Sequence, residues 1–273
     1  MSLWRLPAAA DDRQTYFAHA LALTAAHGPG PWPDGGHPLP DAEERDAVPD
    51  GAKTTEQVAH QVGRMIGAIV REPPEVQALQ RLHDLLAQHV AAGLAGHLAG
   101  RIEDLDRARV RDVGRWLAEY GTRFNAVANG IVLIGLAGDE RDREWLLLLG
   151  SLDPMAFYAV EALARTQSDR DMAVFELAQR VRADGRVMAV CRLAETTDPR
   201  IKAWLLREGF RASNTVEHLA CIAATTGDLA GALAESDVDD ALLDGASGIL
   251  KALCNGMPRA QMSASAMIVH CGL

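Results

Sequence analysis

Apolar residues recur at helical spacing over most of the chain, and Gly, Asp and Pro separate the apolar segments. The first segment predicts a helix over about residues 12–27, with Asp11 or Asp12 as its cap. The second, TEQVAHQVGRMIGAIVRE, predicts a helix that Thr54 or Thr55 caps and that ends before residues 73–74, which are both Pro. The pattern therefore favours an all-helical protein.

A third segment, EVQALQRLHDLLAQHVAAGLAGHLAG, predicts one long helical stretch after residue 74. Its small residues Ala92, Gly96 and Gly100 lie four apart on one helix face. Small residues at this spacing let two helices approach closely, so this face is predicted to pack against another helix.

Residues 28–51 interrupt the helical pattern with the sequence GPGPWPDGGHPLPDAEERDAVPDG. Neither a helix nor a strand persists through so many Pro, Gly and Asp residues. A loop of this length is usually functional or disordered. It is predicted to be either a flexible linker or a lid or docking loop, the second because Trp32, His37 and Leu39 offer side chains to bury.

From about Asp104 the chain becomes a succession of short amphipathic segments with a period close to thirty residues. A large aromatic residue marks every odd segment, at intervals of 29, 30 and 29 residues: Trp116, Trp145, Phe175 and Trp204. An aliphatic residue marks every even segment, at intervals of 27, 30 and 29: Leu136, Leu163, Leu193 and Ile222. Two markers in phase indicate repeated helix pairs. The predicted organisation is an N-terminal helical region at 1–103 that includes loop 28–53, repeats at 104–257 and a C-terminal tail at 258–273.

The segment EWLLLLGSLDPMAFYAVEALA shows how one repeat is built. Four consecutive leucines resemble a strand, but a helix that is covered on several sides by stacked neighbours is also apolar almost all round. WLLLL is therefore predicted to be the first helix of a pair, 150–153 its turn, and PMAFYAVEALART the second helix. Pro154 suits the first turn of that helix, and Asp153 is its expected cap.

The second segments, DPMAFYAVEALART, ADGRVMAVCRLAET and SNTVEHLACIAATT, resemble the short HEAT-like repeats of α-solenoid proteins. The resemblance covers about residues 104–254 and implies an α–α superhelix of four to five helix pairs, right-handed in its stacking. The usual Arg of the second helix is replaced by Tyr158 in one repeat and by Val187 or Met188 in another.

A longer run, IKAWLLREGFRASNTVEHLACIAATTGDLAGALAESDVDDALLDGASGIL, resembles an uncharacterised bacterial HEAT-repeat group. Some members of that group are named limonene hydroxylase. The resemblance implies the fold, and it implies very little about the chemistry. The final MPRAQMSASAMIVHCGL departs from the acidic ending expected of the group.

Composition narrows the choice of partner. The 273 residues are 48% hydrophobic and 5% aromatic, and 37 acidic against 27 basic residues give a formal charge of −10. That charge repels a phosphate backbone, so no nucleic-acid partner is predicted, although binding of damaged DNA by a basic groove is a third alternative. No apolar run approaches the roughly 20 residues of a membrane span, and MSLWRLPAAADDR lacks the apolar run of a signal peptide. A cytoplasmic location without membrane contact is expected.

Motifs for catalysis are not found. The chain has no HExxH, GxxxxGK[ST], GxSxG or CxxC motif, and the glycines of HGPGPWPDGG follow no strand. A metal site that combines His60 with His83 or His97 is conceivable, but solvated or singly hydrogen-bonded histidines are the better interpretation. Cys191 and Cys221 lie in apolar helical stretches and are expected to be buried. No cofactor and no metal are predicted.

The favoured function is therefore binding without catalysis, in which the concave face of the stacked helix pairs holds a protein or peptide. Asn125 and Asn129 lie one turn apart and, with Arg123, could clamp a peptide main chain. Candidate groove residues, all at or near the starts of second helices, are Arg123, Asn125, Asn129, Tyr158, Glu161, Arg186, Asn214, Glu217 and His218.

Two alternatives remain at this point. The groove residues could instead cap helices and bridge adjacent repeats. The chain could also be an enzyme, an oxygenase or a hydrolase, with a pocket between the N-terminal helices and the repeats that loop 28–51 covers. The apolar tail near its end could cap the last repeat or form a homodimer with a second copy.

Overall fold

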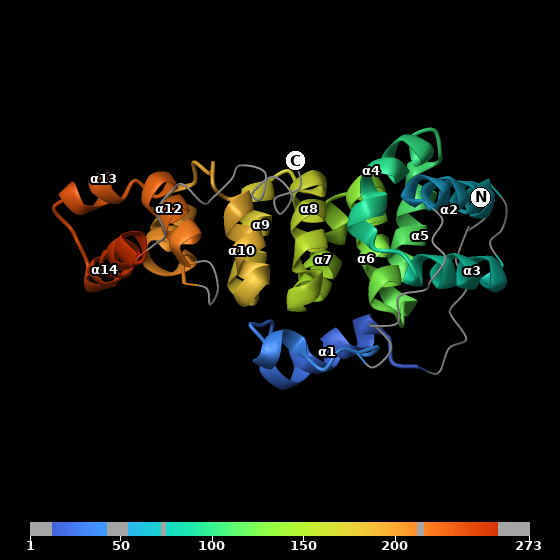
Figure 1. Cartoon of the computed structure of the whole chain (residues 1–273), viewed down its shortest axis with the longest axis horizontal. Coiled ribbons are helices and arrows are strands. Elements are labelled where there is room, and N and C mark those ends of the chain that lie inside the picture. The colour runs from blue at the N-terminus through green and yellow to red at the C-terminus, as the bar shows by residue number, and fades with distance from the viewer. Residues whose placement is uncertain (1–12, 43–53, 72–74, 212–215, 256–273) are drawn as a thin grey trace.

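The structure of the protein is a computed structural model that describes residues 13–42, 54–71, 75–211 and 216–255. These residues form helices joined by turns, with no strand among them. The helices are packed in a series along the longest axis of the molecule (Figure 1). The predicted all-α fold class is confirmed.

The N-terminal region contains four helices: α1 (Tyr16–His27), α2 (Thr55–Arg71), α3 (Val76–Ala87) and α4 (Ala91–Ile102). The cap of α1 is Thr15, whose hydroxyl accepts from Ala18 N at 3.1 Å, so this helix begins later than predicted. Thr54 begins α2 as expected, because its hydroxyl and the Gln57 amide group each bond the other residue's main-chain nitrogen-hydrogen. The prediction that residues 73–74 stop α2 lies outside the described residues.

The long helix predicted after residue 74 is wrong, because the chain turns at residues 88–90 and forms α3 and α4. The predicted packing face is wrong too. Ala92, Gly96 and Gly100 are exposed, and a Cβ added at either glycine would meet nothing within 4 Å. The opposite face, with Leu94, Leu98 and Ile102, is buried instead. Burying three large aliphatic side chains stabilises the fold more than a close approach of small ones.

The remainder of the described chain consists of short helices separated by turns. They are α5 (Arg107–Tyr120), α6 (Phe124–Ala137), α7 (Arg143–Gly150), α8 (Ala156–Thr166), α9 (Arg170–Arg180), α10 (Ala183–Arg192), α11 (Pro199–Trp204), α12 (Val216–Thr226), α13 (Leu229–Ala234) and α14 (Asp240–Asn255). A π-helical turn, Leu205–Gly209, continues α11, and 3-10 turns occupy Pro33–Gly36, Glu140–Asp142 and Asp153–Met155. WLLLL is the first helix of a pair, as predicted.

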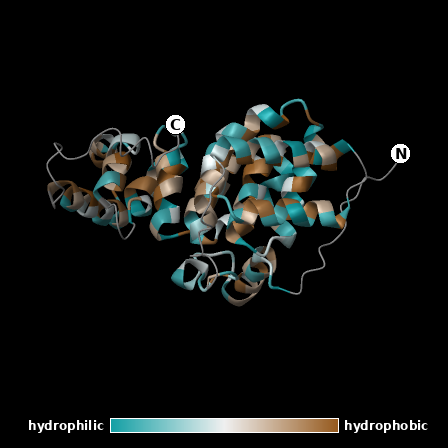
Figure 2. Ribbon diagram, turned by 45° about the vertical axis from the view of Figure 1, so that its right-hand side comes forward, coloured by the Kyte–Doolittle hydropathy of each residue, from teal (hydrophilic) through white to brown (hydrophobic). Residues whose placement is uncertain are grey.

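The helices after α4 pack in a regular order. α5 lies on α6, α7 on α8 and α9 on α10, and each second helix also packs on the next, from α6 through α8, α10 and α12 to α14. The aromatic markers Trp116, Trp145, Phe175 and Trp204 lie on α5, α7, α9 and α11. The hydrophobic side of each helix turns toward its neighbours and the hydrophilic side turns outward (Figure 2). The in-phase markers thus identify alternate helices of the series.

Two hydrophobic clusters meet at α6. One joins α2, α3 and α4 to α5 and α6, and includes Ile66, Leu82, Leu98 and Leu133. The other runs from α1 and α6 to α14. α3 and α4 pack directly on α6, so the N-terminal helices cover one side of the first pair in the series.

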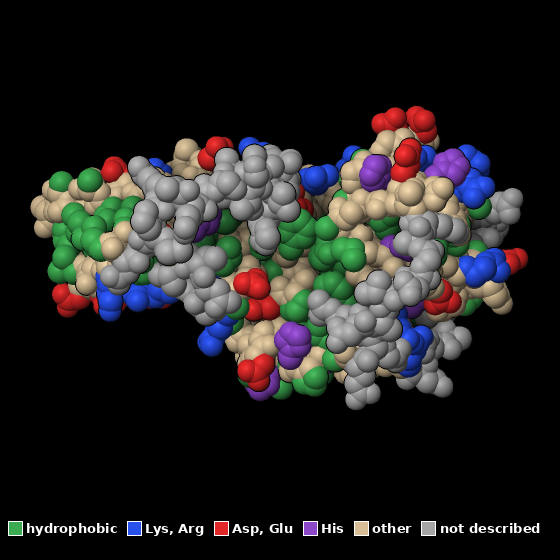
Figure 3. All heavy atoms as spheres, in the orientation of Figure 1, with side chains coloured by type: hydrophobic (Ala, Val, Ile, Leu, Met, Phe, Trp, Pro, Cys, Tyr) green, Lys and Arg blue, Asp and Glu red, His purple; other side chains and the backbone are tan. Residues whose placement is uncertain are grey.

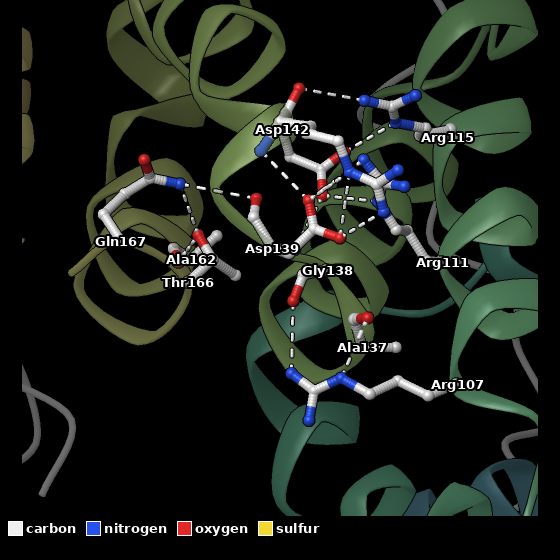
Figure 4. A network of polar contacts seen from close by, with 11 residues as sticks. Arg107, Arg111, Arg115, Ala137, Gly138, Asp139, Asp142, Ala162, Thr166 and Gln167 are labelled. Carbon is white, nitrogen blue, oxygen red and sulfur yellow. Dashed lines mark hydrogen bonds and ion pairs between the residues drawn. The ribbon is translucent and has the colours of Figure 1, made fainter.

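A buried ion network joins the first two pairs (Figure 4). The Asp142 carboxylate is completely buried (0% exposed) and accepts from Arg111 Nε at 2.7 Å, Arg115 Nε at 2.5 Å and Asp139 N at 2.9 Å. Arg107 donates to the carbonyl oxygens of residues 137 and 138 at the end of α6. Hydrogen bonds from Arg141 hold the pKa of Asp139 well below its ordinary value. Every oxygen of the central carboxylate therefore has a charged or main-chain donor.

The N-terminal segment 13–42 crosses the turns of successive pairs, below the other helices in Figure 1. Tyr16 N donates to Gly121 O at 3.0 Å, and the Asp41 carboxylate accepts from Phe124 N at 2.7 Å and from the Tyr16 hydroxyl at 2.5 Å. Trp32 is buried, at 2% exposed. The flexible-linker interpretation is therefore wrong for residues 28–42, which are docked, and residues 43–51 lie outside the description.

Across the described part of the chain, no helix combines the length and the apolar character that crossing a bilayer requires.

Candidate functional site

The second helices α8, α10 and α12 repeat their burial pattern at a spacing of thirty residues. Ala159, Ala189 and Leu219 are fully buried at one position of the pattern, and Leu163, Leu193 and Ala223 are buried four residues later. Between them lie positions that stay half-buried or exposed in all three helices. Because α8 packs on α10 and α10 on α12, these positions form adjacent columns on one surface.

We call this surface the second-helix face. It consists of Phe157, Glu161, Ala164 and Arg165 on α8, Val187, Cys191, Ala194 and Glu195 on α10, and Glu217, Cys221, Ala224 and Thr225 on α12. Its composition is mixed, with apolar, acidic and basic side chains and two thiols. On the side of the molecule drawn in Figure 3, hydrophobic side chains gather in front of the α7–α8 pair, with acidic side chains close by. Such a surface suits a partner that offers both apolar and polar groups.

The predicted asparagine clamp lies elsewhere in the fold. Asn125 Nδ2 donates to Ala87 O at 3.2 Å, and Asn129 Nδ2 donates to His89 O at 3.2 Å and to Asn125 O at 2.8 Å. Both amides therefore hold the connection between α3 and α4 against α6. Arg123, which precedes α6, is half-buried. On α6 the bridging role that the sequence left open describes these two asparagines.

Two predicted residues lie on α8. Tyr158 is 8% exposed and meets Phe157 and Phe124 edge to face, with ring centroids 5.2 Å and 6.3 Å apart. Glu161 is part of the second-helix face, and its carboxylate lies 4.0 Å from Arg165 Nε one turn later. The ring of Tyr158 is mainly a core element, whereas Glu161 presents a charge at the surface.

Arg186 links α10 to the next pair. Its guanidinium lies 5.8 Å from the ring centroid of Trp204, and Nη1 donates to Arg211 O at 3.4 Å. Burial lowers the pKa of Arg186 from its ordinary value. Among the described residues, Nε of Arg186 is buried without a hydrogen-bond partner.

α12 carries the remaining candidates. His218 Nε2 lies 3.5 Å from Cys191 Sγ on α10, and Glu217 precedes it on the half-buried side of α12. Asn214 lies outside the described residues. The expectation that Cys191 and Cys221 are buried is wrong, because Cys191 is half-buried and Cys221 is exposed. Their apolar sequence neighbours face the core, and the cysteines lie on the opposite side of the helices.

The loop residues are separated from this face by their packing. Trp32 Nε1 donates to Gly28 O at 2.8 Å, while His37 is exposed. Asp153 was expected to cap α8, but its Oδ1 accepts from Arg182 N at 3.1 Å and so joins this turn to the start of α10. Gly35 has a φ of +64°, and a Cβ there would lie 2.9 Å from Asp153 Cβ, so the loop sits directly on this turn.

The three histidines of the conceivable metal site have other surroundings. His60 Nδ1 lies 2.9 Å from Arg101 Nη1, and His83 is buried with Thr122 N 3.3 Å from its Nε2. His97 is exposed on α4. Within the described ranges, no group of three or more His, Cys, Asp or Glu residues could hold a metal ion.

Comparison of the chain with protein-family models, with curated proteins and with solved structures found no match.

Sequence analysis missed the two thiols and most of the columns of the second-helix face. The signal was available in the thirty-residue spacing itself. Glu161, Cys191 and Cys221 are separated by thirty residues each, as are Ala164, Ala194 and Ala224. The search for polar residues at the starts of second helices passed over the middle of those helices.

Proposed function

We propose that the chain is a non-catalytic binding protein, a HEAT-like α-solenoid whose second-helix face holds an extended protein or peptide segment. The repetition of exposed positions at thirty-residue spacing on α8, α10 and α12 is the observation that carries this proposal. Stacked helix pairs that repeat their exposed positions present a partner with the same kind of contact several times in a row.

The chemistry of the face defines the partner. Phe157 and Val187 offer apolar contact, while Glu161, Glu195 and Glu217 supply negative charge and Arg165 a single positive charge. An extended segment with apolar side chains and a preponderance of basic ones is the complement. This charge pattern disfavours nucleic acid, in line with the formal charge of −10.

The site begins at α8 rather than at α6. α3 and α4 cover α6, and Asn125 and Asn129 fasten their connection to it. The N-terminal helices therefore act in this proposal as the end cap of the series, and they leave α8, α10 and α12 as the open part.

Selection of displayed peptides tests the proposal. Random 15-residue peptides on phage are panned over the wild-type protein, and the enriched peptides are titrated against a double variant, Cys221→Arg with Thr225→Arg. Both positions are exposed on α12, so the fold is preserved. Leu21→Arg is the control, since Leu21 is exposed on α1, outside the face.

Enriched peptides that bind the wild type and the control at micromolar Kd, and the double variant at least about tenfold more weakly, support the proposal. If peptides bind all three proteins equally, or none is enriched, the second-helix face is not a peptide site.

An oxygenase or hydrolase that loop 28–51 covers is the alternative function. The described part of this loop contacts the turns at residues 152–153 and 180, and its remainder is outside the description. Turnover of any substrate by the purified protein, lost in a variant of the site and not in Leu21→Arg, would favour this alternative.

A further inference from the structure

The second-helix face contains a thiol beside an imidazole. Cys191 lies on α10 and His218 on α12, and the distance between Sγ and Nε2 is 3.5 Å. The two residues are 27 positions apart, so the packing of one second helix on the next brings them together. A nucleophile within hydrogen-bond reach of a base is the arrangement that activates thiols in proteins.

We propose that Cys191 is a reactive thiol, that His218 takes its proton, and that low-molecular-weight disulfides modify it. The step is a thiol–disulfide exchange. The Cys191 sulfur attacks one sulfur of the disulfide and forms a mixed disulfide, while the sulfur–sulfur bond of the reagent breaks. The leaving thiolate accepts the proton that His218 holds, so one small thiol is released for each protein modified.

The chain contains its own controls for this chemistry. Cys221 and Cys254 are exposed, on α12 and α14, while Cys191 is only half-buried. Access alone therefore predicts that Cys191 reacts more slowly than the other two. Activation by His218 predicts the reverse order, because the thiolate and not the thiol is the nucleophile.

Other charges around the pair come from three packed helices. They are Glu161 on α8, Arg186, Arg192 and Glu195 on α10, and Glu217 on α12. Acidic and basic groups both occur in this set, so the imidazole of His218 is the group assigned to the proton transfer on distance.

A modified Cys191 would place a bulky polar group in the middle of the second-helix face. If the face binds a peptide, as proposed above, this modification blocks it, and that consequence alone rests on the proposed function. Thiol reactivity is measured without any peptide, so the two proposals can fail separately.

Glutathione disulfide is the probe, and the modified fraction of each cysteine is followed by peptide mass spectrometry on the full chain. At pH 6.5 we expect Cys191 to react at least about tenfold faster than Cys221 and Cys254, whose rates fall about tenfold per pH unit below an ordinary thiol pKa of about 8.5. The rate of Cys191 should change much less between pH 8 and pH 6.5.

In the His218→Gln variant the Cys191 rate should fall to or below that of Cys221, with an unchanged circular dichroism spectrum. A Cys191 that reacts no faster than Cys221 in the wild type, or a rate that survives His218→Gln, overturns the proposal. The wild-type pH profile decides the question even if the variant does not fold.

Discussion

Asp142 is the position where a single change should cost the fold most for its size. Its carboxylate is 0% exposed and accepts from Arg111 Nε at 2.7 Å and Arg115 Nε at 2.5 Å. Asp142→Asn keeps the shape of the side chain and removes its charge. The amide nitrogen of Asn would then face a guanidinium donor, and Arg111, whose side chain is 8% exposed, would keep a buried charge without its counter-ion.

The magnitude follows from this burial. Removing one partner of a buried ion pair costs about 3–5 kcal/mol, because the remaining charge is left without compensation. No cavity adds to this figure, since Asn and Asp have nearly the same volume. For a chain of this size each kcal/mol corresponds to about 2–4 °C in Tm, so Tm should fall by roughly 10 °C.

Thermal unfolding followed by circular dichroism measures the effect, with Asp198→Asn as the matched control. Asp198 makes the same kind of contact, with Arg200 Nη2 at 2.8 Å, but the Arg200 side chain is 68% exposed. Asn also preserves the cap of α11, so the control should shift Tm very little. Equal shifts in the two variants would refute the argument that burial decides the strength of this network.

Four further predictions concern packing, protonation and association. Gly130→Ala should cost about 1–3 kcal/mol, because its Cβ would lie 2.8 Å from Leu117 Cβ, whereas Gly96→Ala should gain about 0.5–1 kcal/mol at a site with nothing within 4 Å; urea unfolding measures both. Burial raises the pKa of Asp153, so its ionised form destabilises the fold above that pKa, and Asp153→Asn should raise Tm at pH 7 with a gain that vanishes as the pH falls below about 3.9. Hydrogen bonds from Arg200 lower the pKa of Asp198 to about 2, so the stability it supplies should be present above about pH 3.9 and lost as the pH falls to 2, a loss absent from Asp198→Asn. A homodimer stays a prediction; if it forms through α14, where Leu250 is 51% exposed, Leu250→Asp should abolish the concentration dependence of the mass in light scattering.

Periodicity predicted the helix pairs well because it follows directly from burial. WLLLL is helical in the structure, since α7 is covered by neighbouring helices on more than one side. Periodicity did not predict the break at residues 88–90, where no Pro or Gly marks the turn. It also chose the wrong face of α4, because small residues at a spacing of four occur on solvent-exposed faces as well as at interfaces.

The candidate site was harder to predict than the fold. Asn125 and Asn129 were correctly placed one turn apart, but the sequence does not say that α3 and α4 return to cover them. The contact between Cys191 and His218 joins different helices, and no local pattern encodes it. Residues whose role depends on which helix lies opposite can be recognised only after the packing is known.

The repeat explains why polar partners differ so much along the series. Each second helix presents the same positions, so a change at one of them alters the local surface without disturbing the buried residues that the repeat requires. At the end of the series Asn129 binds the N-terminal helices, whereas in the open part Glu161, Cys191 and Cys221 occupy one column with three different exposures and two chemistries. A buried repeat therefore supplies the scaffold, and its variable columns are where function should be sought.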